Sequence, residues 1–580
     1  MTRRGPVLLT VLVAVLLLLA GCSTLPESGP VRRQAADRPD QRLDAPYFNP
    51  PGPAEDGSPA AIVSGFLVAM QANPLSTKVA REFLSERASA SWRPNRGTMV
   101  YEASTVTPSA GGADVRLSDV RRLDSRGGWR NDPPGRSTTL GLDLVSEGGQ
   151  WRIDNPVDAL VVPTSFFNRS FERFDLYFFD QTGRTLLPDP VFIPRGEQSA
   201  TNLVRGVLAG PGPALSEVTR SAFPRGTGLD LSVVVTESGV AEVPLTRDVL
   251  RAPPEDLERA VDQLAWTLRQ VPGIERVRLT VGGAAVPLPG GSIDASVLSG
   301  DDYDAAGTTE PVLHGLRNGR VVEFSTGSAR SVPGPLGKPG YAMRSLAVSE
   351  APAQVSAVSA DGTTVFQALL DGATDDTPVT RVVDGTDLLR PSYDLFGDLW
   401  IVDRSRSGAR VLVVSSGRAR ALDVPGVSGR DVVAATVSRD GTRLAVVLGG
   451  DRPGEVRVVD VLRTDEGQVA GTGRTRVFRA STDGAAVVDV GWRDPGTLAV
   501  LTRPSRETSR VAFLSSDGSP VEPGLVEPSL FRGVGTALAV SPQLEVPLRL
   551  VDSRQQLFTL SDTGTWPLTS SKISAADYAP

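Results

Sequence analysis

The sequence predicts a multidomain, β-rich protein, in which two mixed helix-and-strand domains precede a C-terminal β-propeller of about six blades. Three observations lead to this fold class. The 580-residue chain has 59 glycines and 46 prolines between many short Val-rich segments, which is typical of strands joined by turns. Segments with helical periodicity occur in the first half. The second half repeats a strand–turn–strand motif at intervals of about 40 residues, the length of a propeller blade.

Residues 1–21 have the layout of a secretory signal, with a basic start and an apolar run over residues 7–20. The run is shorter than the roughly 20 residues that a spanning helix needs, which favours a cleaved signal over a transmembrane anchor. The run ends in LAGC at residues 19–22, which resembles the bacterial lipobox, and Cys22 is the only cysteine of the chain. The resemblance implies cleavage before Cys22 and diacylation of its sulfur, which would hold the protein on the cell membrane. An ordinary secretory signal with an incidental cysteine is the alternative.

Residues 22–53 are rich in Pro, Arg, Asp and Gly, and they predict a flexible tether. A first domain is expected at residues 54–165. It begins with a helix capped by Ser58, with Pro59 in its first turn. Helices followed by an antiparallel sheet that ends in GGQWRIDNP resemble the NTF2-like α+β fold. Such cones can hold ligands, but no carboxylate–histidine pair is apparent, which favours a non-catalytic module.

A second α+β domain is expected at residues 170–289. It contains a helix over 197–208 and a longer helix that opens at Pro253-Pro254, with an apolar stripe from Leu257 to Leu268. The stretch LRQVPGIERVRLTVGG resembles the GerMN domain. The resemblance implies a packing or interaction module.

The segment 290–309 is predicted to be a polar linker. It contains three acidic residues, Asp301, Asp302 and Asp304, that could suggest calcium. Their spacing lacks the glycine and the terminal glutamate of an EF-hand loop, which favours a solvated linker over a metal site.

Residues 310–580 are predicted to form the propeller. The stretches VSADGTTVFQALL, VSRDGTRLAVVL and GWRDPGTLAVLT share an Asp-containing turn between two apolar strands. Asp361 and Asp440 lie 79 residues apart, about two units of ~40, and SYDLFGDLWIVD falls between them as the intervening unit. The repeated aspartates are predicted to be turn residues rather than ligands. The segment VLHGLRNGRVVEFS supplies a further blade, which we expect both chain ends to close jointly.

Charge and composition exclude several classes of function. The net charge is −7, and removal of residues 1–21, which hold two arginines and no acid, makes it −9. An acidic protein of this kind is not expected to bind nucleic acid. His314 is the only histidine and is predicted to be structural, and no G-x-S-x-G, Walker or H-E-x-x-H motif occurs. We therefore expect no catalytic residue, no metal and no cofactor, although paired carboxylates for glycoside hydrolysis stay open.

A lipobox, a helix-led first domain, a GerMN-like domain and a C-terminal propeller, in this order, resemble the actinobacterial LpqB lipoprotein family over nearly the whole chain. The resemblance implies an extracytoplasmic accessory of the MtrA/MtrB two-component system. It would contact the extracellular domain of the sensor kinase MtrB and affect cell-wall homeostasis and cell division. Cys22 is the one residue to which the resemblance gives a role. Two other functions stay open, namely binding of cell-wall glycan or peptide by the propeller face, and exported hydrolysis.

Overall fold

The computed structural model describes residues 47–130, 135–307, 310–325, 328–350, 352–450, 454–480, 484–521 and 525–579. Residues 47–580 group into one compact unit. Cys22 and the rest of the predicted signal lie outside the described residues, as does most of the predicted tether.

The first domain begins with helix α2 (Pro59–Ala69), which starts as the sequence predicts. The Oγ of Ser58 accepts a hydrogen bond from the backbone N–H of Ala61 at 3.3 Å, and Pro59 lies in the first turn. The ring of Phe66 on this helix packs 5.5 Å from that of Trp92. The other elements of this domain are α3 (Lys78–Glu82), α4 (Glu86–Ser91), β1 (Thr98–Tyr101), β2 (Ala103–Ser109), β3 (Gly112–Ser118), β4 (Arg121–Leu123), β5 (Thr138–Glu147), β6 (Gln150–Ile153), β7 (Leu160–Pro163) and α5 (Thr164–Ser170).

Two sheets complete the first domain. Strands β2, β3, β5 and β6 form an antiparallel sheet in that order, and α2 lies against it. Strands β4, β1 and β7 form a second sheet, in which β1 and β7 run parallel. Helices that come first in the chain therefore cover an antiparallel sheet, as the sequence predicts.

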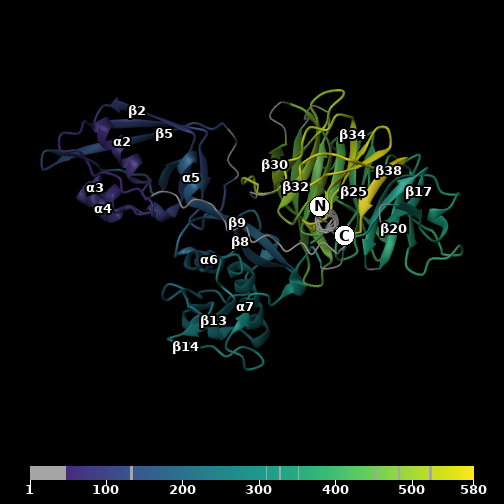
Figure 1. The fold of residues 1–580 in the computed structure, drawn as a ribbon, viewed down its shortest axis with the longest axis horizontal. Helices are drawn as coiled ribbons and strands as arrows, with labels where there is room; N and C mark the ends of the chain where they lie inside the picture. The colour runs from purple at the N-terminus through teal and green to yellow at the C-terminus, as the bar shows by residue number, and fades with distance from the viewer. Residues whose placement is uncertain are drawn as a thin grey trace, which may run out of the picture. The chain divides into compact units, whose positions relative to one another are not determined.

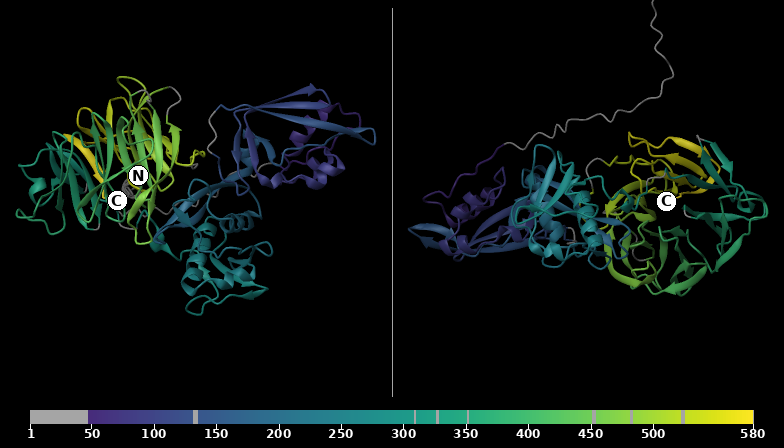
Figure 2. Two further views of the ribbon diagram at one scale, coloured as in Figure 1. Left: turned by 180° about the vertical axis from the view of Figure 1, so that it is seen from behind. Right: turned by 90° about the horizontal axis from the view of Figure 1, so that it is seen from below.

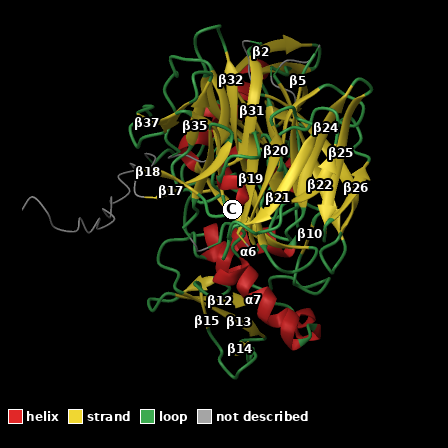
Figure 3. Cartoon of the chain, turned by 90° about the vertical axis from the view of Figure 1, so that its right-hand side faces the viewer, coloured by secondary structure: helices red, strands yellow, loops and turns green. Residues whose placement is uncertain are grey.

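The second domain combines a hairpin, a small sheet and two helices. Its elements are β8 (Phe171–Asp180), β9 (Leu186–Pro194), α6 (Ser199–Leu208), β10 (Thr219–Arg220), β11 (Val234–Val235), β12 (Val240–Pro244), α7 (Pro254–Leu268), β13 (Arg276–Val281), β14 (Ala284–Ala285) and β15 (Ala295–Ser296). Helix α7 joins the parallel strands β12 and β13, as a crossover connection must. Most of its predicted apolar stripe is buried, and the helix packs against β8 and β13. Figure 3 shows α7 in red beside β13. Strand β15, from within the predicted linker, pairs with β13.

The C-terminal half is a six-bladed propeller. Blade 1 consists of β16 (Leu313–Arg317), β17 (Arg320–Ser325), β18 (Ser328–Ser331) and β38 (Ile573–Tyr578), and blade 2 of β19 (Met343–Glu350), β20 (Ala353–Ser359), β21 (Thr364–Leu369) and β22 (Thr380–Asp384). Blade 3 consists of β23 (Ser392–Tyr393), β24 (Leu399–Ser405), β25 (Gly408–Ser415) and β26 (Arg418–Leu422), and blade 4 of β27 (Val432–Val437), β28 (Arg443–Leu448), β29 (Glu455–Arg463) and β30 (Val469–Arg479). Blade 5 consists of β31 (Ala486–Trp492), β32 (Thr497–Arg503) and β33 (Arg510–Ser515), and blade 6 of β34 (Gly535–Ala539), β35 (Arg549–Asp552), β36 (Gln556–Thr559) and β37 (Leu568–Ser571). The right-hand view of Figure 2 shows these sheets around a common centre.

The two ends of the propeller sequence close its ring, which confirms the predicted joint blade. Strand β38, the last of the chain, pairs antiparallel with β16, the first of the propeller, with Leu313 opposite Tyr578 and Gly315 opposite Ala576. Strand β38 is the innermost strand of blade 1 and lies next to β19 of blade 2 and β34 of blade 6. Figure 1 shows it in yellow beside the teal strands of the first blades.

The repeated turn does not occupy one position in every blade, which corrects the register inferred from the sequence. Asp440 lies in the turn between β27 and β28, the two innermost strands of blade 4. Asp361 lies between β20 and β21, the second and third strands of blade 2. The sequence signal is local, since any hairpin with an apolar strand on each side produces it. The 79-residue interval is therefore not the length of two whole blades.

Candidate functional site in the axis of the propeller

Cys22, the only residue with a predicted role, lies outside the described residues, so the predicted lipidation stays a prediction. No catalytic, metal-binding or cofactor-binding residue was expected. Within the described ranges, the structure contains no group of three or more His, Cys, Asp or Glu side chains that could hold a metal ion.

His314 lies on β16 in a buried environment. Its Nδ1 is 3.2 Å from the carbonyl oxygen of Val312, and its Nε2 is 4.0 Å from a carboxylate oxygen of Glu323. Burial lowers the pKa of His314, which favours the neutral imidazole. These contacts agree with the predicted structural role.

The acidic residues of the turns and of the linker are engaged in local contacts. Asp440 accepts hydrogen bonds from the backbone N–H of Thr442 and from the hydroxyl of Ser438, and Asp361 accepts from the backbone N–H of Thr363. In the linker, a carboxylate oxygen of Asp301 lies 3.6 Å from Arg269. These contacts agree with the prediction of turn residues rather than ligands.

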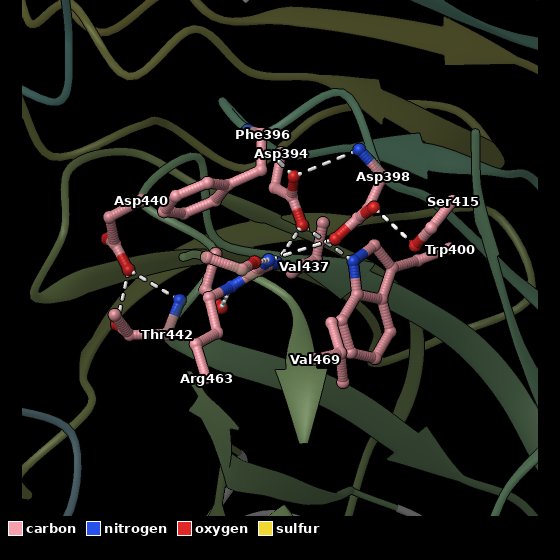
Figure 4. Close-up of polar contacts among 12 residues, drawn as sticks. Asp394, Phe396, Asp398, Trp400, Ser415, Val437, Asp440, Thr442, Arg463 and Val469 are labelled. Carbon is pink, nitrogen blue, oxygen red and sulfur yellow. Dashed lines mark hydrogen bonds and ion pairs between the residues drawn. The ribbon is translucent and has the colours of Figure 1, made fainter. Parts of the chain in front are cut away.

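A buried ion cluster joins blades 3 and 4 (Figure 4). The guanidinium of Arg463, at the end of β29, forms an ion pair with Asp394 and a second one, at 2.9 Å, with Asp398. Asp394 also accepts hydrogen bonds from the indole N–H of Trp400 at 2.8 Å and from the backbone N–H of Phe396 at 3.0 Å. Burial raises the pKa of Asp394 to about 6, although Arg463 acts in the opposite direction.

The partners of this cluster are all within the protein. The Nε of Arg463 donates to the carbonyl of Gly441 at 3.0 Å, and the guanidinium carbon lies 4.1 Å from the centre of the Phe396 ring. Asp398 also accepts a hydrogen bond from the hydroxyl of Ser415. A cluster that is paired and hydrogen-bonded in this way supports the fold and leaves no open position for a ligand.

The axis of the propeller contains two cavities, which together we call the axial channel. Each is lined mainly by residues from the innermost strands of all six blades and from the segments next to these strands. The outer cavity, of about 270 Å³, lies at the starts of these strands, and the inner cavity, of about 70 Å³, lies at their ends. Arg390 lines both cavities and therefore separates them.

Arg390 crosses the axis and binds the opposite side. One terminal nitrogen donates to the carbonyl of Leu538 in blade 6 at 2.5 Å. The other donates to a carboxylate oxygen of Asp489 at 3.1 Å and to the carbonyl of Val490, both in blade 5. The second oxygen of Asp489 accepts the backbone N–H of Leu538 at 2.7 Å. One side chain thus holds blades 3, 5 and 6 together across the axis.

Asp577 lines the inner cavity from β38. It accepts the backbone N–H of Val348 at 3.4 Å and forms no ion pair with any other described residue. Removal from bulk water raises the pKa of Asp577 to about 7, against the attraction of Arg390. This carboxyl group therefore titrates near neutral pH inside the axial channel.

The segment before the propeller contacts the end of the ring that carries the inner cavity. The Nε of Arg439, which lines that cavity, donates to the carbonyl of Ala305 at 2.6 Å. The side-chain amide of Gln543 donates to the carbonyls of Ala306 and Gly307 at 3.3 and 3.2 Å. The outer cavity lies at the other end of the strands.

Sequence reasoning missed every residue of the axial channel. Asp489 and Asp577 each interrupt an apolar strand, in AVVDVGW and ISAADY, and a buried acid in such a pattern is a signal for a polar partner. Arg390 gives no comparable signal, because it precedes its strand in an ordinary polar segment. Its partners lie about 100 residues or more away in the sequence.

Comparison with family models finds three matches along the chain. Residues 52–168 match the N-terminal domain of lipoprotein LpqB, and residues 319–540 match the LpqB β-propeller domain. Residues 175–287 match a model described as sporulation and spore germination. Among solved structures, the tandem GerMN domains of the sporulation protein GerM from Bacillus subtilis are 22% identical, with a TM-score of 0.20, and cover 26% of this chain and 57% of that one.

Curated relatives match over most of their length. Lipoprotein LpqB of Streptomyces coelicolor is 28% identical over 590 residues, which cover 94% of each chain. Lipoprotein LpqB of Mycolicibacterium smegmatis is 28% identical and covers 88% of this chain and 89% of its own. Lipoprotein LpqB of Cutibacterium acnes is 30% identical over 85% of this chain and 86% of its own. The predicted resemblance is thereby confirmed, and the chain belongs to the LpqB lipoprotein family.

Proposed function

We propose that the protein is an extracytoplasmic lipoprotein, anchored through acyl chains on Cys22, that acts as an accessory of the MtrAB two-component system. Its folded domains would contact the extracellular domain of the sensor kinase MtrB and thereby affect cell-wall homeostasis and cell division. The observation that carries the proposal is the match to proteins named lipoprotein LpqB over up to 97% of this chain.

The anchor and the folded domains have separate roles in this proposal. Two acyl chains on Cys22 would confine the protein to the plane of its partner and raise the local concentration without any new contact. A surface of the folded domains would then bind one kinase state more tightly than the other, because equal affinity shifts nothing. Among the described residues, no helix is long and apolar enough to cross a membrane.

The proposal contains no catalytic step. Three acidic residues of the propeller interior are bound to arginines, Asp394 and Asp398 to Arg463 and Asp489 to Arg390. A fourth, Asp577, lines the inner cavity and accepts the backbone N–H of Val348. His314 is buried and hydrogen-bonded. Engaged side chains of this kind support a binding role over hydrolysis.

In-cell crosslinking of the lipidated protein, followed by mass spectrometry, tests the partner. We expect capture of the extracellular domain of a sensor kinase and loss of that capture when residues 174–580 are deleted. Recovery of cell-wall polymers alone would contradict the signalling role and favour glycan or peptide binding by the propeller face.

The anchor is tested by Cys22→Ala, with Ser23→Ala as the matched control. Cys22→Ala removes the one thiol of the chain, so the variant should lose both membrane retention and incorporation of a labelled fatty acid. Ser23→Ala should keep both. Normal anchoring of Cys22→Ala would overturn the lipoprotein assignment of this residue.

A further inference from the structure

The outer cavity of the axial channel is bordered by three arginines. Arg344 lies at the start of β19, and Arg404 lies near the end of β24. Arg390 lines the outer cavity where it meets the inner one. The walls between them are made of small apolar side chains. They include Val433, Ala434, Ala435, Val488, Ala537 and Ala576.

Two polar groups on this cavity lack a partner. The Nε of Arg404 and the hydroxyl of Ser345 are each shielded from solvent and have no hydrogen-bond partner. Buried polar groups are normally satisfied, so such a pair is unusual in a native structure. Both belong to residues that line the outer cavity, so a rotation of either side chain would bring the group to an occupant that supplies an acceptor.

The charged groups of the outer cavity do not balance. Arg344 and Arg404 share one carboxylate, Asp387, through contacts of 2.5 and 2.7 Å. Arg390 is paired with Asp489. Three cations therefore face two anions, which leaves one positive charge. Asp577 lines the inner cavity, beyond Arg390. Because Asp577 is the further carboxyl group that Arg390 attracts, the excess positive charge of the outer cavity lies at Arg344 and Arg404, which share Asp387.

We propose that the outer cavity binds a carboxylate carried by a small, partly apolar molecule. This site goes beyond the proposed signalling role and does not depend on it. A carboxylate fits because it carries one charge and accepts the parallel hydrogen bonds that a guanidinium donates. Arg344 and Arg404 each bind a different oxygen of the Asp387 carboxylate through one terminal nitrogen.

Size and polarity restrict the ligand further. A cavity of about 270 Å³ has the volume of roughly nine water molecules in the liquid, which suits a small acid and not a polymer chain in its full width. The carboxylate would take the free Nε of Arg404, and the hydroxyl of Ser345 would donate to a further acceptor. The apolar walls would contact a short hydrocarbon or methyl group. Arg390 lies at the inner end of the outer cavity and limits how far a ligand can enter.

Ligand-observed NMR on the full chain in detergent micelles tests the site. The probes are propionate and N-acetylalanine, with N-acetylalaninamide as the neutral partner of the latter and inorganic phosphate as an anion of another shape. We expect saturation transfer to the two carboxylates, at least tenfold weaker binding of the amide, and no competition by phosphate at equal concentration. The proposal is overturned if neither carboxylate binds at 10 mM. A dissociation constant of 10 mM corresponds to a binding free energy of about −2.7 kcal/mol.

Variants assign the binding to this cavity. Ser345→Ala should weaken carboxylate binding about threefold without altering the fold, because its hydroxyl has no partner to lose. Arg404→Gln should weaken it at least tenfold, and Arg404→Lys should fall between the two because it keeps the charge but not the planar donors. Arg418→Gln, an exposed arginine on β26, is the matched control and should bind as the parent does. Equal affinity in Arg404→Gln, Ser345→Ala and the parent, or equal binding of acid and amide, excludes this site.

Discussion

Single arginines hold distant blades of the propeller together. Arg463 reaches from blade 4 to two aspartates of blade 3, and Arg390 reaches from the start of blade 3 to blades 5 and 6. Each guanidinium donates hydrogen bonds to several protein acceptors in place of water, so that the buried cation keeps its hydrogen bonds. The loss of one such arginine leaves its carboxylate partners buried without a counter-charge. This costs more stability than replacing the whole ion pair by apolar residues.

Arg463→Met should therefore lower the free energy of unfolding of the propeller by about 3–5 kcal/mol. The methionine keeps much of the side-chain volume, so the effect reports the lost charge beside Asp394 and Asp398. Urea denaturation of the full chain, followed by tryptophan fluorescence, measures it. Arg418→Met, on the exposed part of β26, is the control and should change stability by less than about 0.5 kcal/mol. A loss below about 1 kcal/mol in Arg463→Met would contradict the structural role of the cluster.

Asp577 should make the stability of the propeller depend on pH. Its pKa is about 7 in the folded protein and 3.8 in its unperturbed state, so between these values the folded state keeps a proton that the unfolded state has lost. Stability is therefore highest below pH 3.8 for this group and falls as the pH rises towards 7. Arg390 and Asp489 face the same carboxyl group and are included in this shift.

Asp577→Asn removes that titration. The free energy of unfolding of the variant, minus that of the parent, should rise by roughly 2–4 kcal/mol between pH 4 and pH 8. Denaturation curves at intervals of one pH unit measure this difference. The same measurement on Asp465→Asn, an exposed residue of blade 4, should give a constant difference. A constant difference for Asp577→Asn would show that its environment does not raise the pKa.

At the scale of elements, sequence patterns predicted the helices and turns, because these depend mainly on residues that are close together in the chain. The apolar stripe from Leu257 to Leu268, opened by two prolines, predicted α7, and Ser58 predicted the start of α2. The spacing of turn signals predicted the number of blades. The register of the first repeat was wrong because the turn at Asp361 is the same local structure as the turn at Asp440, in another hairpin of its blade.

The axial channel could not be predicted in the same way. Arg390, Asp489, Leu538 and Asp577 meet only after six blades have closed, and their separation in sequence contains no period that marks them. A buried acid in an apolar strand signals that a partner exists, but not which one. The arginines of the outer cavity likewise come from separate segments of the chain.

Strand β38 should be indispensable to the propeller. Without residues 573–580, β16 loses its inner neighbour and blades 2 and 6 lose the strand between them. The buried side chains of Ile573 and Tyr578 are also lost. We expect the truncated chain to show no cooperative propeller transition in calorimetry and to be digested readily by protease, whereas removal of Pro580 alone should have no such effect. A protease-resistant propeller in the truncated chain would contradict closure by this strand.

At the scale of the whole molecule, the hydrophobic cores are separate. One cluster is built around Phe66 and Trp92, another around α7, and the propeller has a series of clusters between neighbouring blades. Domains with their own cores usually unfold as units. The chain should therefore show more than one calorimetric transition.

Variants in different cores identify these transitions. Phe66→Ala, at a residue 2% exposed, should cost about 3–5 kcal/mol and shift only the transition of the first domain. Arg463→Met should shift only that of the propeller. Differential scanning calorimetry of the full chain distinguishes them, and a single transition that both variants shift equally would show that the domains unfold together.

Closure of the ring by the final strand also affects how the protein is made. The two N-terminal domains are complete in the first half of the chain, but the propeller has no complete first blade until β38 is present. We expect a chain that ends before β38, for example through a nonsense codon, to present an open ring with the unpaired edge of β16 to proteases and to other chains. We therefore expect β38, a strand of six residues, to distinguish closed rings from truncated ones by their resistance to protease.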